Sequence, residues 1–216
     1  MKYIKKIACF TLLLLASVSM LTGCFEPKKD AAETIQVLYK LVISQDTKAA
    51  EDFGIPSSVS ETLLDAYNEA CYQQLKSGFE TNGFSIEDET LRNIIKARCE
   101  MYSKLECTTS ISSQSKKTVS VTVETQYYDE NAIMQKAVKK AMKKAMDENI
   151  MHMSEKQIQR KMGEFYTEYL IKGYEAAEPE EDTRTMFVSC SKQHFLWLPS
   201  SLEDFINLLN DAVSGL

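Results

Sequence analysis

The sequence is poor in the residues that build several common kinds of site. Its 216 residues include two histidines, one tryptophan, four prolines and seven glycines. So few glycines leave little material for a phosphate-binding loop, and the chain contains no dinucleotide fingerprint, Gly-x-Ser-x-Gly elbow or His-Glu-x-x-His motif. Because 44% of the residues are hydrophobic, the chain has enough apolar surface to fold, which excludes collagen-like and disordered interpretations.

The first 23 residues have the pattern of a secretory signal. Three lysines (Lys2, Lys5 and Lys6) precede an apolar run over residues 7–18. A helix of that length spans about 18 Å, which is too short for a hydrocarbon core of about 30 Å. We therefore predict a signal peptide over residues 1–23 rather than a membrane-spanning helix. No second apolar run of comparable character follows.

The signal ends in Leu21-Thr22-Gly23-Cys24, which resembles the lipobox of bacterial lipoproteins. The resemblance implies cleavage after Gly23, a diacylglyceryl thioether on Cys24 and usually a third acyl chain, such as palmitate. Two or more acyl chains anchor a protein durably. Residues 24–30 would then form a lipidated tether at the outer face of the cytoplasmic membrane, in a Gram-positive envelope. The alternative is an ordinary secreted protein in which Cys24 is a structural thiol.

Loss of the signal makes the chain more acidic. The three lysines of residues 1–23 leave with no acid, which takes the formal net charge from −6 to −9. Phosphate backbones repel an acidic domain, so we expect no nucleic-acid partner.

The spacing of apolar residues predicts both helices and strands. Strands of period two are expected near 105–111 and 119–127, and two more within 184–198 that turn near Lys192-Gln193. Capping boxes are predicted at Ser58 with Glu61 and at Ser154 with Gln157, a helix start at Ser85, and a turn between Gly78 and Gly83. Spacing of 3.6 residues predicts the following helices: 31–44, 46–53, 58–77, 85–102, 130–150, 154–176 and 202–213.

This order of elements predicts the fold class. Because strands and helices do not alternate singly, a parallel doubly wound sheet is disfavoured. We predict one α+β domain over residues 31–216, with an antiparallel sheet of about four strands and helices packed on it.

Three features are similar to small lipoproteins of unknown function from low-GC Gram-positive bacteria. They are the lipobox, the segment from Asp46 to Gly54 after the first helix, and Trp197 on the final strand. The resemblance implies an NTF2-like fold, which is a cone of helices on a curved antiparallel sheet. The turn Lys192-Gln193-His194 departs from the Asp-Gly-like turn of that family. The family has no established activity, so no catalytic residue is carried over.

Cysteines outside the signal and the lipobox are candidates for disulfides. Export permits such bonds, and the four cysteines that remain are an even number, so all of them can pair. We predict the pairs Cys71–Cys99, between neighbouring helices, and Cys107–Cys190, between strands. Buried free thiols are the alternative. A zinc site is disfavoured because the chain has no Cys-x2-Cys spacing.

Histidine offers little support for catalysis. His152 lies near Asp147, Glu148 and Glu155, but helix-dipole effects account for such groups at helix ends. His194 is expected at a solvated hairpin turn. We expect no metal, no cofactor and no catalytic residues. An envelope hydrolase that uses scattered carboxylates or His152 is the least favoured alternative.

Two further sets of side chains are candidates for binding. Five lysines share one face of the helix over 130–150 and could contact anionic lipid or teichoic acid, at about 1 kcal/mol per lysine; a solvated face is the alternative. Four aromatic residues could line an NTF2-like cavity for a small apolar or sugar ligand, or could simply fill the core. The lysines are Lys136, Lys139, Lys140, Lys143 and Lys144, and the aromatic residues are Tyr127, Tyr166, Tyr169 and Trp197.

We therefore expect a lipid-anchored, non-catalytic binding or interaction module at the cell envelope. Its partners would be the membrane, through the lipid on Cys24, and a small-molecule or protein ligand. A toxin-immunity or stress lipoprotein is the alternative.

Overall fold

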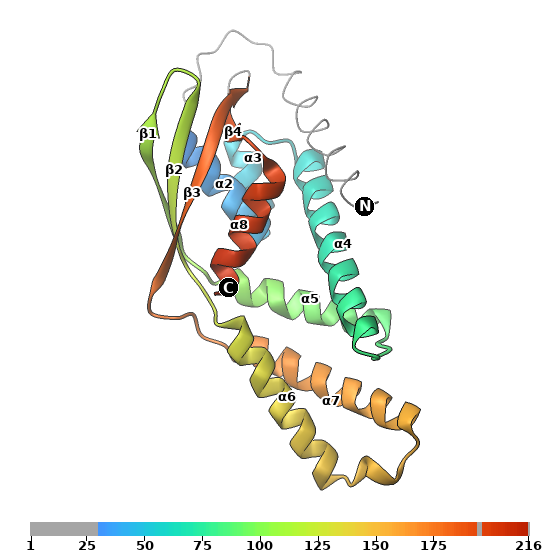
Figure 1. The fold of residues 1–216 in the computed structure, drawn as a ribbon. Coiled ribbons are helices and arrows are strands. Elements are labelled where there is room, and N and C mark those ends of the chain that lie inside the picture. The colour runs from blue at the N-terminus through green and yellow to red at the C-terminus, as the bar shows by residue number, and fades with distance from the viewer. Residues whose placement is uncertain (1–29, 194–195, 216) are drawn as a thin grey trace.

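An open antiparallel sheet of four strands lies at one end of the molecule (Figure 1). The computed structural model describes residues 30–193 and 196–215. The predicted signal peptide, Cys24 and His194 lie outside these residues. The strands follow one another in the order β1-β2-β3-β4. Their bounds are Cys107–Gln114 (β1), Thr118–Gln126 (β2), Thr183–Gln193 (β3) and Leu196–Pro199 (β4).

One face of the sheet is apolar, because every second residue of a strand points to the same face and the apolar residues of β2 alternate with polar ones. Val119, Val121 and Val123 of β2 are buried, and Val121 lies opposite Val188 of β3. The alternate residues of β2 are polar and lie on the opposite face. Phe187 of β3 also lies on that face, and it is apolar although 63% of its surface is exposed.

Strand β1 forms one edge of the sheet, and its sequence is rich in serine and threonine. Its register with β2 shifts between Ile111 and Ser113. The Oγ atom of Ser112, the residue at this irregularity, donates to the carbonyl of Ser120 across the strand pair, at 3.0 Å. The exposed edge of the sheet is therefore short, polar and uneven.

Helices α2 (Ala31–Ile43) and α8 (Leu202–Ser214) cover the apolar face of the sheet (Figure 1). Asp30 caps α2, because its carboxylate accepts the backbone N–H of Glu33 at 2.7 Å. The hydroxyl groups of Tyr39 and Thr125 share a hydrogen bond between α2 and β2. The predicted apolar face of α2 is confirmed as core: Ile35, Leu38, Tyr39, Val42 and Ile43 are buried.

The predicted short helix after α2 is also confirmed. Helix α3 (Thr47–Phe53) begins after Asp46, whose carboxylate accepts the backbone N–H of Ala49 at 2.9 Å. It ends at Gly54, whose φ of 101° is a left-handed conformation that glycine adopts without a steric cost.

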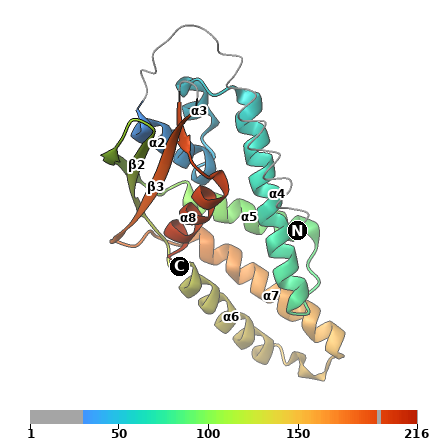
Figure 2. The ribbon, with the colours of Figure 1, turned by 45° about the horizontal axis from the view of Figure 1, so that its top comes forward.

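The remaining helices form a second group beside the sheet. Helices α6 and α7 make an antiparallel hairpin that extends away from the sheet (Figures 1 and 2). The prediction that the helices as a group pack on the sheet is therefore wrong for the hairpin, whose apolar faces meet each other and α5. The bounds are Ser57–Thr81 (α4), Asp88–Tyr102 (α5), Glu130–Asp147 (α6), Ile150–His152 (the 3-10 turn η1) and Glu155–Glu175 (α7).

Two predicted helix boundaries are wrong. Helix α4 follows Pro56 without a side-chain cap and continues through Gly78 to Thr81, so the Ser58 capping box and the turn at Gly78 are absent. Helix α5 begins after Glu87 rather than at Ser85. Serine and glycine signals are local, and here the packing of the long helix overrides them. At the start of α7, the Gln157 side chain does accept the backbone N–H of Ser154, as predicted.

Candidate ligand-binding cavity

A cavity of about 710 Å³ lies among helices α4, α5, α6 and α7, and the C-terminal end of α2 closes its inner end. No strand residue contributes to its wall among the described residues. Most of the lining side chains are apolar or aromatic. The lining residues include Tyr67, Cys71, Gly78, Phe79, Arg98, Cys99, Tyr102, Glu130, Val138, Met162, Tyr166 and Tyr174.

The cavity is long and differs chemically between its two ends. Tyr67 and Phe79 are both in its wall and are twelve residues apart on α4, which corresponds to about 18 Å. Met162 and Tyr174 have the same separation on α7. The charged pair Arg98 and Glu130, with Tyr102 and Tyr174, lies toward the sheet, and the wall further from the sheet is mostly apolar, with Gln74 and Asn82 at its rim. The cavity therefore has a polar inner end and an apolar outer end.

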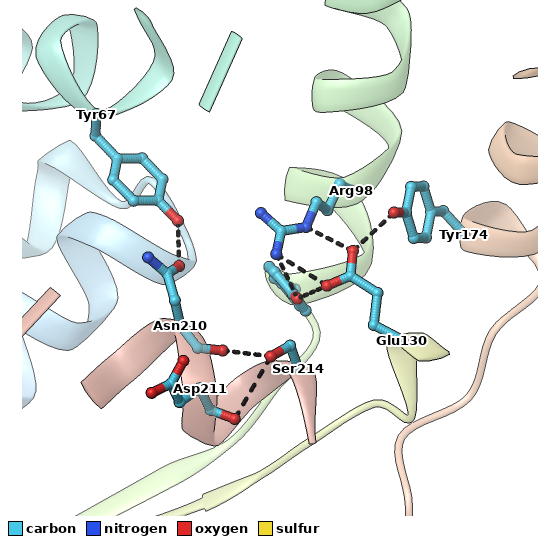
Figure 3. A network of polar contacts seen from close by, with 8 residues as sticks. Tyr67, Arg98, Glu130, Tyr174, Asn210, Asp211 and Ser214 are labelled. Carbon is cyan, nitrogen blue, oxygen red and sulfur yellow. Dashed lines mark hydrogen bonds and ion pairs between the residues drawn. The ribbon is translucent and has the colours of Figure 1, made fainter. Parts of the chain in front are cut away.

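The polar end is built around a buried ion pair between α5 and the first residue of α6 (Figure 3). The Nε atom of Arg98 donates to Glu130 Oε1 at 2.7 Å, and Nη2 donates to Oε2 at 2.9 Å. The hydroxyl of Tyr102 donates to Oε2 at 2.8 Å, and that of Tyr174 donates to Oε1 at 2.7 Å. Only 8% of the Glu130 side chain is exposed, so four donors satisfy a nearly dry carboxylate.

These contacts keep Glu130 ionised. Burial by itself raises the pKa of this carboxyl, but the hydrogen bond and charge of Arg98, with the two tyrosine hydroxyls, outweigh burial and hold the pKa below its ordinary value. Burial raises the pKa of Tyr102 and Tyr174 far above the usual range. The cluster is thus one cation, one anion and two neutral phenols.

One nitrogen of the guanidinium keeps its hydrogen-bonding capacity. Within the described part of the chain, Arg98 Nη1 donates to no protein acceptor, whereas Nε and Nη2 are both engaged (Figure 3). The guanidinium also lies against the ring of Tyr102, 4.8 Å from its centroid. Because Glu130 already neutralises its charge, Arg98 offers a ligand N–H donors without a net positive charge.

The apolar end of the cavity is open at its rim. Gln74, Gly78 and Asn82 of α4 and Val138 of α6 line the cavity and are exposed. No heavy atom outside the backbone of its own helix lies within 4 Å of the position that a Cβ of Gly78 would occupy. A larger side chain at position 78 would therefore enter open space without a clash.

Sequence analysis missed this polar cluster. Glu130 lies 32 residues from Arg98 and 44 from Tyr174, so no local motif links them. One signal was present: Arg98 follows Ile94 by four residues and precedes Tyr102 by four, and both neighbours are buried. An arginine on the inward stripe of a helix needs an acidic partner.

The four candidate disulfide cysteines are free thiols in the structure. The predicted pair Cys107–Cys190 is wrong. Cys107 lies opposite Thr125 of β2, which pairs in turn with Arg184 of β3, whereas Cys190 is six residues further along β3. That offset is about 20 Å, and a disulfide needs Cα atoms within about 7 Å.

Cys71 and Cys99 both line the cavity. Burial raises the pKa of both thiols, to about 11 for Cys99. The Sγ atom of Cys99 accepts a hydrogen bond from Gln45 Nε2 at 3.0 Å. Both residues therefore behave here as small, weakly acidic wall residues.

The candidate aromatic residues are dispersed. Tyr166 lines the main cavity, and its ring lies 5.9 Å from that of Phe79. Tyr169 lines a smaller hollow of about 390 Å³ on the other side of the hairpin. The Cζ atom of Arg184 lies 4.7 Å from the ring centroid of Tyr127, and Trp197 of β4 packs against the core. Neither aromatic residue is in the wall of the main cavity.

Four of the five candidate lysines are exposed, whereas Lys144 is half-buried. Lys144 pairs with Glu168 of α7 at 2.8 Å and lies 4.6 Å from the ring centroid of Phe165. Lys136 and Lys140 line the smaller hollow. Lys139 and Lys143 are exposed. The next face of the helix carries the exposed apolar residues Val138, Met142 and Met146.

His152 lies in η1, where its Nδ1 atom is within hydrogen-bonding distance of the carbonyl of Asn149. Across residues 30–193 and 196–215, no three histidine, cysteine or acidic side chains gather as a metal site. In the same ranges, no helix is long and apolar enough to cross a membrane.

Fold and site together define an α+β protein with an open antiparallel sheet and a helix-lined cavity. No family model matches the chain, and no curated protein matches it. The fold is similar to the crystal structure of "a putative lipoprotein (ycdA)" from Bacillus subtilis, with a TM-score of 0.56 and 15% sequence identity. The match covers 71% of this chain and 47% of that chain, so this chain spans about half of it. At that identity the likeness shows the fold alone.

Proposed function

We propose that this chain is a lipoprotein anchored by its lipid at the outer face of the cytoplasmic membrane in a Gram-positive envelope, and that its folded domain binds a small molecule without transforming it. The observation that carries the proposal is the cavity of about 710 Å³, with apolar walls and one convergent polar cluster. Small-molecule sites typically have this size and composition.

The anchor is supported by the sequence and by the structural neighbour. Leu21-Thr22-Gly23-Cys24 has the lipobox pattern, and the neighbour with the same fold is described as a lipoprotein. Acylation of Cys24 would hold the start of α2 within about 20 Å of the membrane, because six extended residues separate them.

The NTF2-like assignment is part of the proposal. The open antiparallel sheet with α2 and α8 on one face supports it. The cavity differs from the one we expected for such a fold, because helices rather than strands line it.

The state of the polar cluster favours binding over catalysis. A general base needs a pKa near the working pH, whereas the pKa of Glu130 is held below its ordinary value by Arg98 and the two tyrosines. Its two oxygens already accept four hydrogen bonds. The cluster is thus suited to orient a ligand rather than to transfer a proton.

A neutral apolar fluorophore tests the cavity. N-Phenyl-1-naphthylamine should fluoresce strongly with the full chain carrying Cys24→Ser, which cannot be acylated at residue 24. Adding Gly78→Leu should reduce the binding at least tenfold, because the new side chain enters the cavity. Ala70→Leu, at an exposed position of the same helix outside the cavity wall, is the matched control and should bind normally. Equal binding by both leucine variants would contradict the cavity as the site.

Fractionation tests the anchor separately. The wild-type chain should remain with the membrane, and Cys24→Ser should move to the medium or accumulate uncleaved. Mass spectrometry of the wild-type N-terminus should show acylated Cys24. An unacylated N-terminus in membrane-free protein would overturn this part of the proposal.

A further inference from the structure

We propose that the natural ligand is an amphiphile with a hydrocarbon tail and an uncharged head that accepts hydrogen bonds, bound head inward. This inference rests on the proposed binding function and specifies the class of ligand. Its basis is the difference between the two ends of the cavity and the neutral charge balance of the polar end.

The shape of the cavity favours an extended chain. A volume of about 710 Å³ over a length of about 18 Å leaves a mean cross-section of about 40 Å². The outer part is walled by Phe79, Val138, Met162 and Tyr166, which offer dispersion contacts but few hydrogen bonds. A hydrocarbon chain makes favourable contacts with these walls. A sugar would find polar partners in this part only at Gln74 and Asn82 on the rim, and its other hydroxyl groups would be unpaired.

The direction of binding follows from the same arrangement. The polar residues Arg98, Tyr102, Glu130 and Tyr174 lie at the inner end of the cavity, next to the sheet. The exposed rim at Gly78 and Val138 is at the apolar end. A head group would therefore bind inside, and the hydrocarbon tail would extend to the rim.

The charge of the head is set by the ion pair. Arg98 and Glu130 are the charged residues in the wall, and they neutralise each other in bidentate geometry. A carboxylate head would add an unpaired negative charge to a poorly solvated site or displace Glu130, and either is costly. A cationic head would face N–H donors. An ester or amide carbonyl or a hydroxyl can accept from Arg98 Nη1 without adding charge.

Displacement of N-phenyl-1-naphthylamine from the Cys24→Ser chain tests the inference with three ten-carbon probes. We expect 1-decanoylglycerol, which is neutral, to displace the fluorophore at a concentration at least tenfold lower than decanoate or decyltrimethylammonium. Comparable displacement by decanoate would overturn the neutral head. Absence of fluorophore binding would instead overturn the proposed function itself.

A second comparison tests the direction of binding. Arg98→Lys retains a cation beside Glu130 but removes the free Nη1 group. It should therefore weaken the binding of 1-decanoylglycerol at least fivefold more than it weakens the binding of the fluorophore. Circular dichroism and the melting temperature check that this variant is folded. Ser77→Leu, at an exposed position of α4 outside the cavity wall, is the matched control and should leave both affinities unchanged. Equal weakening of probe and fluorophore by Arg98→Lys would contradict a head bound at Arg98.

Discussion

Arg98 and Glu130 form an ion pair that joins α5 to α6 and lines the cavity. Each has the other as its main electrostatic partner, and Tyr102 and Tyr174 complete the hydrogen bonds of the carboxylate. Burying such a pair costs desolvation free energy, but removing one partner destabilises the fold far more, because the other charge stays buried without its partner. Its members should therefore respond very differently to single and double substitution.

Arg98→Met should lower the free energy of unfolding by about 3 kcal/mol, because it leaves Glu130 buried without its cation. The double variant Arg98→Met with Glu130→Met should recover most of that loss. Urea unfolding of the wild type, of Arg98→Met, of Glu130→Met and of the double variant measures both effects. A single substitution that costs no more than the double would show that the pair does not act as a unit.

The pH dependence of stability has a defined sign. Because the pKa of Glu130 is lower in the folded chain, the unfolded chain binds more protons, and the stabilisation is complete above pH 4.5, the ordinary pKa of this group. It is lost as the pH falls from there through the folded pKa. Glu130→Gln should therefore show a shallower loss of stability in acid than the wild type.

An exposed glutamate provides the control for this measurement. Glu175→Gln at the end of α7 should keep the steep acid slope of the wild type. Melting temperatures between pH 3 and pH 7 distinguish the variants. If Glu130→Gln matched the wild-type slope, the assigned shift would be contradicted.

At the scale of elements, the hairpin of α6 and α7 depends on close approach of the two helices. A Cβ on Gly173 of α7 would lie 2.9 Å from Ile133 Cγ2 of α6. Glycine therefore permits an interhelical distance that a larger residue would prevent. The hairpin is held further by Lys144 of α6, which hydrogen-bonds to Glu168 of α7. Lys172, one turn along α7 from Glu168, also donates to this carboxylate, and the two lysines lower its pKa to about 2.

Gly173→Val should destabilise the chain by about 1–3 kcal/mol, since overpacking forces the helices apart. Combination with Ile133→Ala should cost less than the sum of the two single changes, because the smaller residue makes room. Thermal denaturation of the two single variants and the double variant measures this coupling. Additive losses would contradict the contact as the cause.

Elements were predictable from sequence where the signal was local. The five buried apolar residues of α2 follow helical spacing, and Gln157 does meet Ser154 at the start of α7. The prediction failed at Gly78, where a residue that commonly ends a helix lies within α4 because its missing side chain faces a cavity. Local propensity could not reveal that cavity.

At the scale of the whole molecule, the candidate site was mostly beyond reach of the sequence. The cavity joins four helices over more than one hundred residues, from Tyr67 to Tyr174. Tyr166 was among the candidates, but Arg98 and Glu130 were not. The error at Cys107 and Cys190 has a similar origin, because strand register fixes which residues meet and alternation alone leaves it open.

Hydrogen exchange should distinguish the sheet from the hairpin of α6 and α7. Amides of β2 should exchange slowest, because the strand is paired on both sides and its valines are buried. Amides near the exposed Met151 at the tip of the hairpin should exchange fastest. Saturating 1-decanoylglycerol should slow exchange in α4 and α6 but not in β1. Uniform slowing throughout the chain would contradict binding in the cavity.

The irregular edge of the sheet at β1 affects how readily copies of this chain can pair through their strands. Attachment to a membrane confines neighbours to two dimensions and raises their local concentration, which favours strand-to-strand addition between copies. Such addition needs a long, regular row of unpaired backbone groups. The register shift between Ile111 and Ser113 interrupts that row. The β1 edge is therefore poorly suited to strand addition between copies that the proposed anchor would hold side by side.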